Sequence, residues 1–220
     1  MSRSKRVFRL IQKRLSGVVL CKDMLVVPPT EHIVRGFLLE TTTEKNRVYL
    51  WRVVAPLYRP MSGIILNYSD RIPKDGEVYI DRDDYEKSAD RIRAIISGRH
   101  IEYLQGIRRP QDFLEHASWI GDGSPILNRL DRALTHYLLG NVQQSTAALR
   151  TLDEEVDQLE ARQQQYIGPL LKQAMRQIDK DPADLTALLD EWENQNVERF
   201  ALGPSRLSSD RPRLVVSQAQ

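Results

Sequence analysis

The sequence predicts an α+β protein: a small, mostly antiparallel sheet covered by an N-terminal helix, followed by an all-helical C-terminal part with one long helix. Three observations lead to this prediction. A basic amphipathic segment opens the chain, β-branched and aromatic residues form short runs over 18–80, and apolar residues recur at helical spacing from residue 83 onward. We expect an α+β domain over 1–120, a helical extension over 121–203 and a disordered tail over 204–220.

The N-terminal helix is expected over 2–15. Its apolar residues recur at helical spacing: Val7, Leu10, Ile11 and Leu15. The candidate anion-binding residues are four of its basic residues, Arg6, Arg9, Lys13 and Arg14. Each cation near an anionic lipid surface contributes about 1 kcal/mol, and contacts to nucleic-acid phosphates use the same charges. The other interpretation is structural, with the apolar side covering the sheet and the basic side in solvent.

Short strands are expected at 18–20, 24–27, 33–39, 48–57, 64–66 and 78–80. Four or five of them would pair into one sheet. The clearest pair is 33–39 with 48–57, because the polar segment 41–46 suits a hairpin connection. Proline is confined to strand ends and edges, so Pro56, Pro60 and Pro73 mark the ends of these strands.

Helices are expected at 83–97, 110–119, 126–139, 141–167, 169–178 and 182–202, with a helical turn at 101–104. The helix start with the clearest sequence signal is Ser124-Pro125, an N-cap residue followed by a proline in the first turn. No helix breaker occurs between Asn141 and Ile167, so this segment is expected to form one helix of about seven turns.

Residues 137–145 resemble the turn of a tetratricopeptide helix pair, with Gly140-Asn141 at the turn and a small residue, Ser145, where the helices approach. Arg132 and Ala133 stand where that family has Leu-Gly, and the sequence holds no second copy. Repeats of this kind need neighbours to bury their faces. We therefore expect an ordinary helical hairpin here.

The expected long helix carries a heptad-like apolar seam. The predicted partner-binding residues are its members Leu149, Leu152, Val156, Leu159 and Tyr166. A narrow stripe of this kind packs against another helix at a shallow angle. That helix belongs to the chain's own downstream segments, to a second copy in a homodimer, or to another protein. If the chain covers its own seam, we expect the partner on the acidic outer side, because residues 142–202 hold six basic and twelve acidic residues.

Catalytic and metal-binding motifs are missing from the sequence. It has no P-loop, no dinucleotide glycine motif, no nucleophile elbow and no kinase motifs. The four histidines are isolated, and the acidic run 81–84 suits the first turn of a helix better than a calcium loop. We therefore predict no catalytic residues, no metal and no cofactor.

The functional prediction is a non-enzymatic protein that binds another protein through its C-terminal helices, as an accessory, inhibitor or adaptor. The alternative is a protein that binds nucleic acid or an anionic surface with the basic N-terminal helix, and the second alternative is a hydrolase without a recognisable motif. No apolar run approaches the roughly 18–20 residues of a transmembrane helix. A single cysteine suits a reducing compartment, so we expect a cytoplasmic location.

Overall fold

The computed structural model describes residues 2–64, 66–73, 77–119, 125–181 and 184–206. Within these ranges the strands are β1 (Val19–Cys21), β2 (Met24–Val26), β3 (Ile33–Thr41), β4 (Arg47–Pro56), β5 (Asp70–Arg71) and β6 (Val78–Tyr79). The helices are α1 (Arg3–Gln12), α2 (Tyr85–Ile96), α3 (Arg99–Gly106), α4 (Pro110–Trp119), α5 (Pro125–Leu138), α6 (Val142–Glu155), α7 (Ala161–Lys180) and α8 (Asp184–Arg199), with 3-10 turns η1 (Val156–Gln158) and η2 (Gly203–Ser205). The α+β class is confirmed.

The strands form one antiparallel sheet in the order β1-β2-β3-β4-β5, with β6 also paired to β4. Its centre is the predicted hairpin, in which β3 and β4 stay in register from Ile33 opposite Pro56 to Thr41 opposite Val48. Gly36 lies where β2 and β3 approach closely. A Cβ atom there would lie 2.4 Å from the carbonyl oxygen of Leu25, so only glycine fits this position.

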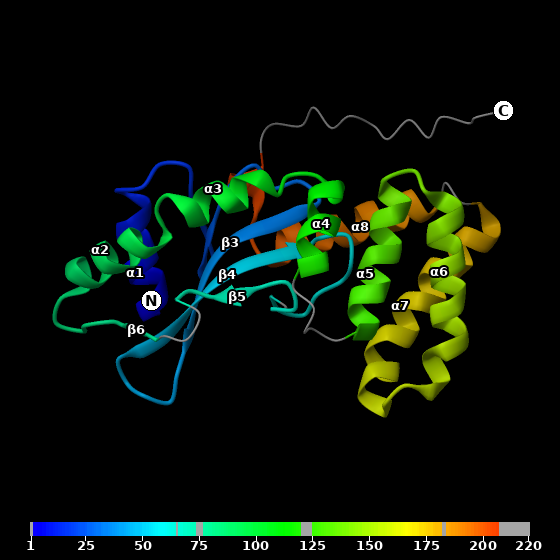
Figure 1. Cartoon of the computed structure of the whole chain (residues 1–220), viewed down its shortest axis with the longest axis horizontal. Coiled ribbons are helices and arrows are strands. Elements are labelled where there is room, and N and C mark those ends of the chain that lie inside the picture. The colour runs from blue at the N-terminus through cyan, green and yellow to red at the C-terminus, as the bar shows by residue number, and fades with distance from the viewer. Residues whose placement is uncertain (1, 65, 74–76, 120–124, 182–183, 207–220) are drawn as a thin grey trace.

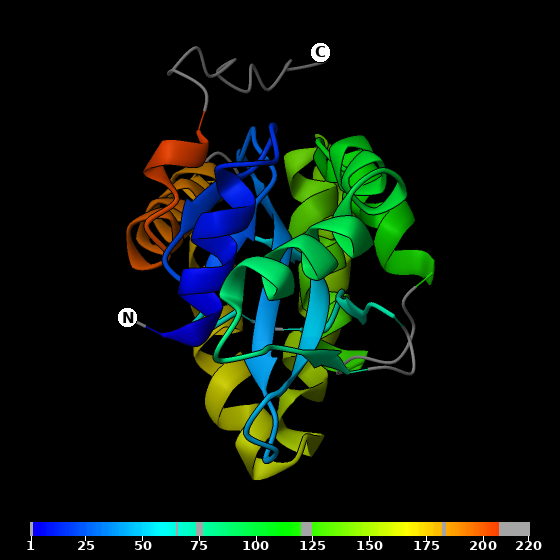
Figure 2. The same cartoon turned by 90° about the vertical axis from the view of Figure 1, so that its left-hand side faces the viewer.

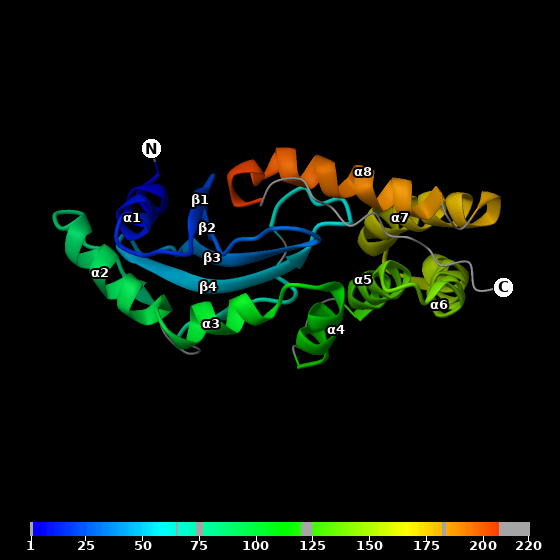
Figure 3. The same cartoon turned by 90° about the horizontal axis from the view of Figure 1, so that it is seen from above.

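Helices cover both faces of the sheet, but from different parts of the chain. In Figure 3, α2 and α3 lie on one side of β3 and β4, and α8 lies on the other. Figure 2 shows α1 and α2 in front of the strands. On this first face Phe8 of α1, Ile92 of α2 and Leu104 of α3 are buried with Phe37 of β3. The N-terminal helix therefore contributes to the sheet's core, as predicted.

The opposite face is covered from the C-terminal end. Leu202, just after α8, is fully buried with Val34 of β3 and Val53 of β4. Val197 and Phe200 pack partly buried around them. Because successive strand residues point to opposite faces, β3 and β4 each supply apolar side chains to both cores, and their sequences read as nearly continuous apolar runs.

Helices α5 to α8 form a separate core beside the sheet (Figure 1). Leu134 of α5, Leu149 of α6, Leu171 of α7 and Trp192 of α8 are all buried in it. The expected hairpin between α5 and α6 is present, and Gly140 turns the chain with φ +81°.

The expected single helix over 141–167 is wrong. The chain leaves the helical conformation between α6 and α7, where Leu159 is extended with φ −74° and ψ 160°. The side-chain amide of Gln164 donates to the carbonyls of Asp157 and Leu159 at 2.9 and 2.8 Å. These two carbonyl groups at the break are therefore hydrogen-bonded within the chain. The break lets α7 pack back against α6. A straight helix of that length, about 40 Å, would leave its seam to be covered by something else.

The expected boundary at Gly168-Pro169 is also wrong, since α7 continues through Pro169. Proline in a helix leaves the carbonyl four residues earlier without its donor. Here Pro169 and Gln165 both lie on the exposed side of α7, where water can bond that carbonyl. The buried side of the helix keeps its packing.

Three further differences concern the ends and edges. Ile64 and Leu66 lie in no strand, and Ile65 falls outside the described residues. The strand that follows instead is β5, which is too short to have an alternating sequence pattern. The start of the expected disordered tail is ordered, since η2 spans Gly203–Ser205 and the buried Ser205 hydroxyl donates to the Thr30 hydroxyl at 2.8 Å. From residue 207 onward the expected tail falls outside the described residues. Among the helices of the described ranges, none is long and apolar enough to cross a membrane.

Candidate functional site

A buried ion pair joins the sheet to the helical part. Arg59, in the segment after β4, and Asp131, on α5, have side chains that are 1% and 0% exposed. Arg59 Nε donates to Asp131 Oδ1 at 2.5 Å and Nη2 donates to Oδ2 at 3.2 Å, while the Tyr68 hydroxyl donates to Oδ2 at 3.1 Å. Burial raises the pKa of Asp131, and Arg59 opposes that rise. Burial would lower the pKa of Arg59, but the carboxylate of Asp131 raises it above its ordinary value.

This ion pair is the centre of a larger polar network. Tyr58 and Thr135 share a hydrogen bond of 2.5 Å between their hydroxyls. Arg59 Nη1 donates to the Tyr166 hydroxyl at 2.8 Å, which places α7 against the same guanidinium. From α8, the Asn196 amide donates to the carbonyl of Arg59 at 2.6 Å. The network therefore holds three helices against the segment after β4, and its role is structural.

Sequence reasoning missed both members of the pair. Asp131 had a signal, because it lies among Leu127, Leu130 and Leu134 on the apolar side of α5, where an unpaired acid is rarely buried. The sequence around Arg59 gives no such signal, because its partner lies 72 positions away along the chain.

The predicted seam residues lie in and around the helical core. Leu149, Leu152 and Val156 are buried, and Leu159 and Tyr166 are half-buried against them. The chain's own helices cover the seam, which was one of the alternatives. The three buried members, Leu149, Leu152 and Val156, are therefore not on the surface of the folded chain.

The four predicted anion-binding residues lie on α1 or just after it, and they divide into two pairs. Arg6 lies 4.3 Å from the centre of the Tyr85 ring, and Arg14 pairs with two carboxylates of α2. Arg9 and Lys13 are exposed, and their side chains make no hydrogen bond or ion pair within the described part of the chain. The apolar side of α1 is buried in the sheet core, so the folded chain cannot insert this helix into a bilayer.

A hollow of about 490 Å³ opens on the outer side of the helical part, where α7 meets α8. Its lining consists of Gln173, Arg176, Gln177, Asp179, Lys180 and Leu188. Leu188 forms an apolar floor, being 8% exposed. Asp179 is engaged, since it accepts a hydrogen bond of 3.3 Å from Arg150 of α6.

A basic stripe runs along α7 beside this hollow. Lys172, Arg176 and Lys180 follow one another at four-residue spacing, which places successive side chains about 6 Å apart along one side of a helix. All three are exposed, and none of their side chains forms an ion pair or hydrogen bond with another residue that the structure describes. The hollow is therefore bordered by unpaired cations, although the C-terminal segment as a whole is acidic.

A cluster of titratable side chains joins α3 and α4 to β4 and β5. His116 Nε2 lies 2.9 Å from the carbonyl oxygen of Tyr68, so this nitrogen carries the proton, and Nδ1 accepts from the Tyr103 hydroxyl at 2.6 Å. Arg52 stacks 4.0 Å from the Tyr103 ring and holds Asp70 through two hydrogen bonds of 2.9 Å. Burial, and then the charge of Arg52, lower the pKa of His116. Each group already has a partner, so the cluster is a structural contact that depends on pH.

No three His, Cys, Asp or Glu side chains of the described ranges lie close enough together to hold a metal ion. Comparison of the chain with protein-family models, with curated proteins and with solved structures found no match. The resemblance of residues 137–145 to a tetratricopeptide turn is accordingly limited to the hairpin of α5 and α6. Any functional conclusion rests on the residues of this chain.

Proposed function

We propose that this protein binds another protein through the outer face of α7 and α8, and that the bound segment of the partner is acidic. The observation that carries the proposal is the unpaired basic stripe of Lys172, Arg176 and Lys180 beside a hollow with an apolar floor. A functional surface combines attraction at long range with a place for an anchoring side chain, and this face has both.

The charges of the stripe act together. Their spacing of about 6 Å is shorter than the Debye length of about 8 Å at physiological salt, so the three cations produce one positive potential. A partner segment with acids at matching positions, such as one face of an acidic helix, is complementary to it. Complementary charge of this kind speeds association and selects the partner more than it adds affinity.

The hollow provides the place for an anchoring side chain of the partner. Its volume of about 490 Å³ is within the roughly 300–1,000 Å³ of ordinary binding pockets, which is ample for one apolar side chain of a partner. Leu188 offers that side chain an apolar contact, and the amides of Gln173 and Gln177 can bond the partner's backbone.

The surface is also held rigidly. Leu171, Ala174 and Ile178 fix the opposite side of α7 in the helical core. Tyr166, at the start of the same helix, is bonded to the buried Arg59. A preorganised surface loses less entropy on binding, which favours α7 over a loop as a docking element.

The test is site-specific photo-crosslinking with the intact chain. A crosslinking residue replaces Gln173 in the hollow or, as the matched control, Gln12 on α1, since both are exposed glutamines of helices. We expect Gln173, and not Gln12, to be joined to an acidic segment of a second protein. With that purified partner, R176E/K180E weakens binding by about tenfold or more, and reversing the partner's acids restores it. The double variant K5E/R9E on α1 changes binding by no more than about twofold.

The proposal predicts weaker binding as salt rises, because the contact is electrostatic. It is contradicted if the partner joined at Gln173 binds R176E/K180E as tightly as the wild type, or if the joined segment is basic. A crosslink at Gln12 alone would move the interface to α1.

A further inference from the structure

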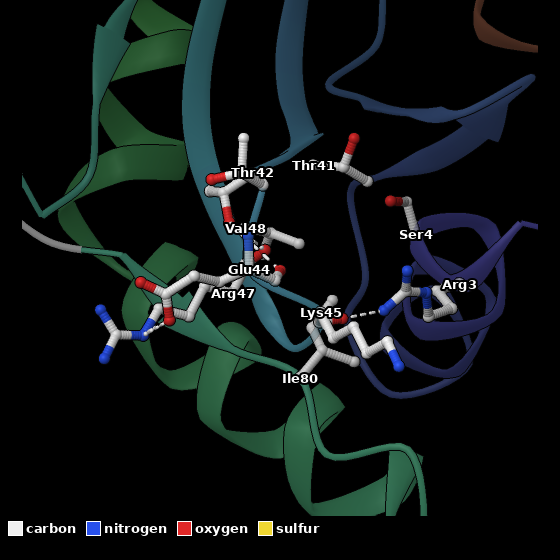
Figure 4. A pocket seen from close by; sticks show the side chains of 10 residues that line it. Arg3, Ser4, Thr41, Thr42, Glu44, Lys45, Arg47, Val48 and Ile80 are labelled. Atoms are coloured by element: carbon white, nitrogen blue, oxygen red, sulfur yellow. Dashed lines mark hydrogen bonds and ion pairs between the residues drawn. The ribbon is translucent and has the colours of Figure 1, made fainter.

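A second candidate site lies at the opposite end of the molecule, between the first turn of α1 and the connection from β3 to β4. It is a cavity of about 130 Å³, and Figure 4 shows the side chains around it. The polar side chains of its wall include Arg3 and Ser4 of α1 with Thr41, Thr43, Lys45 and Arg47 of the hairpin. Hydroxyl groups and cations from two elements therefore face one small space.

Three cations converge on this end of the hairpin without a counterion. Arg3 Nη1 and Arg82 Nη2 both donate to the carbonyl oxygen of Lys45, Arg82 at 3.3 Å. Neither guanidinium, nor the ammonium of Lys45, forms an ion pair with a residue of the described ranges. Like charges brought together by one neutral carbonyl repel each other, and a bound anion would remove that repulsion.

The carboxylate in the cavity wall does not supply that countercharge. Glu44 pairs with Arg47 at 3.0 Å, and Arg47 pairs again with Glu77 at 3.0 Å. The hydroxyls of Thr41 and Thr43 make no hydrogen bond within the described part of the chain, so both remain available as donors.

We infer that this cavity binds a single phosphate group, free or carried as a monoester on a small molecule. Its volume is well below the roughly 300–1,000 Å³ of pockets for larger ligands, so it selects a compact anion. A phosphate monoester carries about −1.5 to −2 charges at pH 7 and three acceptor oxygens. Arg3 and Lys45 of the lining match the charge, and the free threonine hydroxyls match the remaining acceptors. Arg82 is not part of the lining, but it adds a third positive charge beside the Lys45 carbonyl.

Two further cations of α1 assist this site. Lys5 is half-buried and Arg9 is exposed, they lie one turn apart on the same helix, and neither side chain has an ion pair within the described ranges. They lie about 6 Å apart, and they raise the positive potential through which an anion approaches. We therefore place the anion-binding role that was expected for the basic helix at the first turn of α1, beside the hairpin of β3 and β4.

The experiment titrates the intact chain with sodium phosphate and, separately, with methyl phosphate, against sodium chloride at the same ionic strength. Backbone amide signals of Thr41, Thr43 and Lys45 are followed by NMR. We expect saturable shifts of these three signals with phosphate, and none with chloride. K45Q weakens binding by about tenfold, the equivalent of one charge-assisted hydrogen bond. K13Q removes the same charge at the C-terminal end of α1, away from the cavity lining, and leaves binding within about twofold.

The two phosphate arms separate the sources of the ligand. Saturation by both ions supports a group carried on a larger molecule, and saturation by inorganic phosphate alone supports the free ion. Equal weakening by K45Q and K13Q would overturn the inference, because it would mean general attraction to a basic surface. So would shifts that fail to saturate, or shifts that chloride reproduces. R82Q provides a second variant, since within the described ranges the Arg82 side chain makes one hydrogen bond, to the Lys45 carbonyl.

Discussion

Arg59 and Asp131 form a doubly hydrogen-bonded ion pair between the segment after β4 and α5, and both side chains are almost fully buried. Burying a charge costs free energy, and a close opposite charge offsets that cost. Arg59 and Asp131 each supply this opposite charge to the other. The pair fixes how the helical part sits on the sheet, and it thereby sets the orientation of α7 through Tyr166.

Removing one member of this pair should destabilise the fold strongly. We expect Asp131→Ala to lower the free energy of unfolding by about 3–5 kcal/mol, because the Arg59 charge stays buried without its partner. The double variant R59M/D131L should lose less than the single variants R59M and D131L together. Urea unfolding monitored by tryptophan fluorescence measures the wild type and the four variants. Additive losses would mean that the two charges do not depend on each other.

Arg35 is predicted to behave differently from Arg59, although both are 1% exposed. Arg35 Nη1 donates to the Ile107 carbonyl at 2.7 Å, but Nε and Nη2 have no hydrogen-bond partner in the described part of the chain. Burial, and then the nearby Arg108, lower its pKa to about 10. Glu31 and Asp112 offset only part of the cost of burying this charge, and neither forms an ion pair with Arg35 within the described ranges. Arg35→Met should therefore leave the free energy of unfolding within about 1 kcal/mol of wild type or raise it.

We compare Arg35→Met with Arg59→Met, measured by the same urea titration. Arg59→Met should cost several kcal/mol, since it leaves Asp131 unpaired. An equal loss in both variants would mean that Arg35 has an anionic partner outside the described ranges.

His116 should make stability depend on pH. Its pKa is lowered in the folded protein, chiefly by burial, so near pH 6 the unfolded chain binds more protons than the folded one. The contribution of His116 is fully present above its unfolded pKa of about 6.5 and is lost as the pH falls toward the folded value. His100 and His136 also have lowered pKa values and act in the same direction.

The variant His116→Gln isolates the contribution of His116 to the pH dependence of stability, because a glutamine amide can still donate to the Tyr68 carbonyl. The free energy of unfolding is measured at about pH 7.5 and pH 5.5, either side of the ordinary histidine value. We expect a smaller loss in the variant than in the wild type. Identical losses would assign the pH dependence to the other histidines or to carboxylates.

A charge placed in the helical core should unfold the protein rather than separate two chains. Leu152 is 1% exposed, so Leu152→Asp should lower the free energy of unfolding by about 3–5 kcal/mol. Thr151→Asp, one position away and exposed, should change it by about 0.5 kcal/mol. Thermal unfolding gives both values. If light scattering found a wild-type dimer that Leu152→Asp converted to stable monomers, the seam would lie between chains.

The local elements of this protein were determined by its sequence. Ile33 to Leu39 and Val48 to Leu57 read as strands on either side of a polar turn, and they pair as expected. Gly140 ends α5 because it adopts a positive φ that other residues rarely take. In both cases the information lies within a few residues of the structure it specifies.

Only the tertiary structure decided where the helical seam ends and which charges remain free. The break before α7 has no glycine or proline, and it exists because α7 gains a core by packing against α6. Of the basic residues, Arg6 and Arg14 are held against α2, whereas Arg176 and Lys180 have no ion-pair partner among the described residues and lie on the surface of α7. A cation has the same sequence signature whether it is paired or free, because its partner is chosen by contacts between segments far apart along the chain.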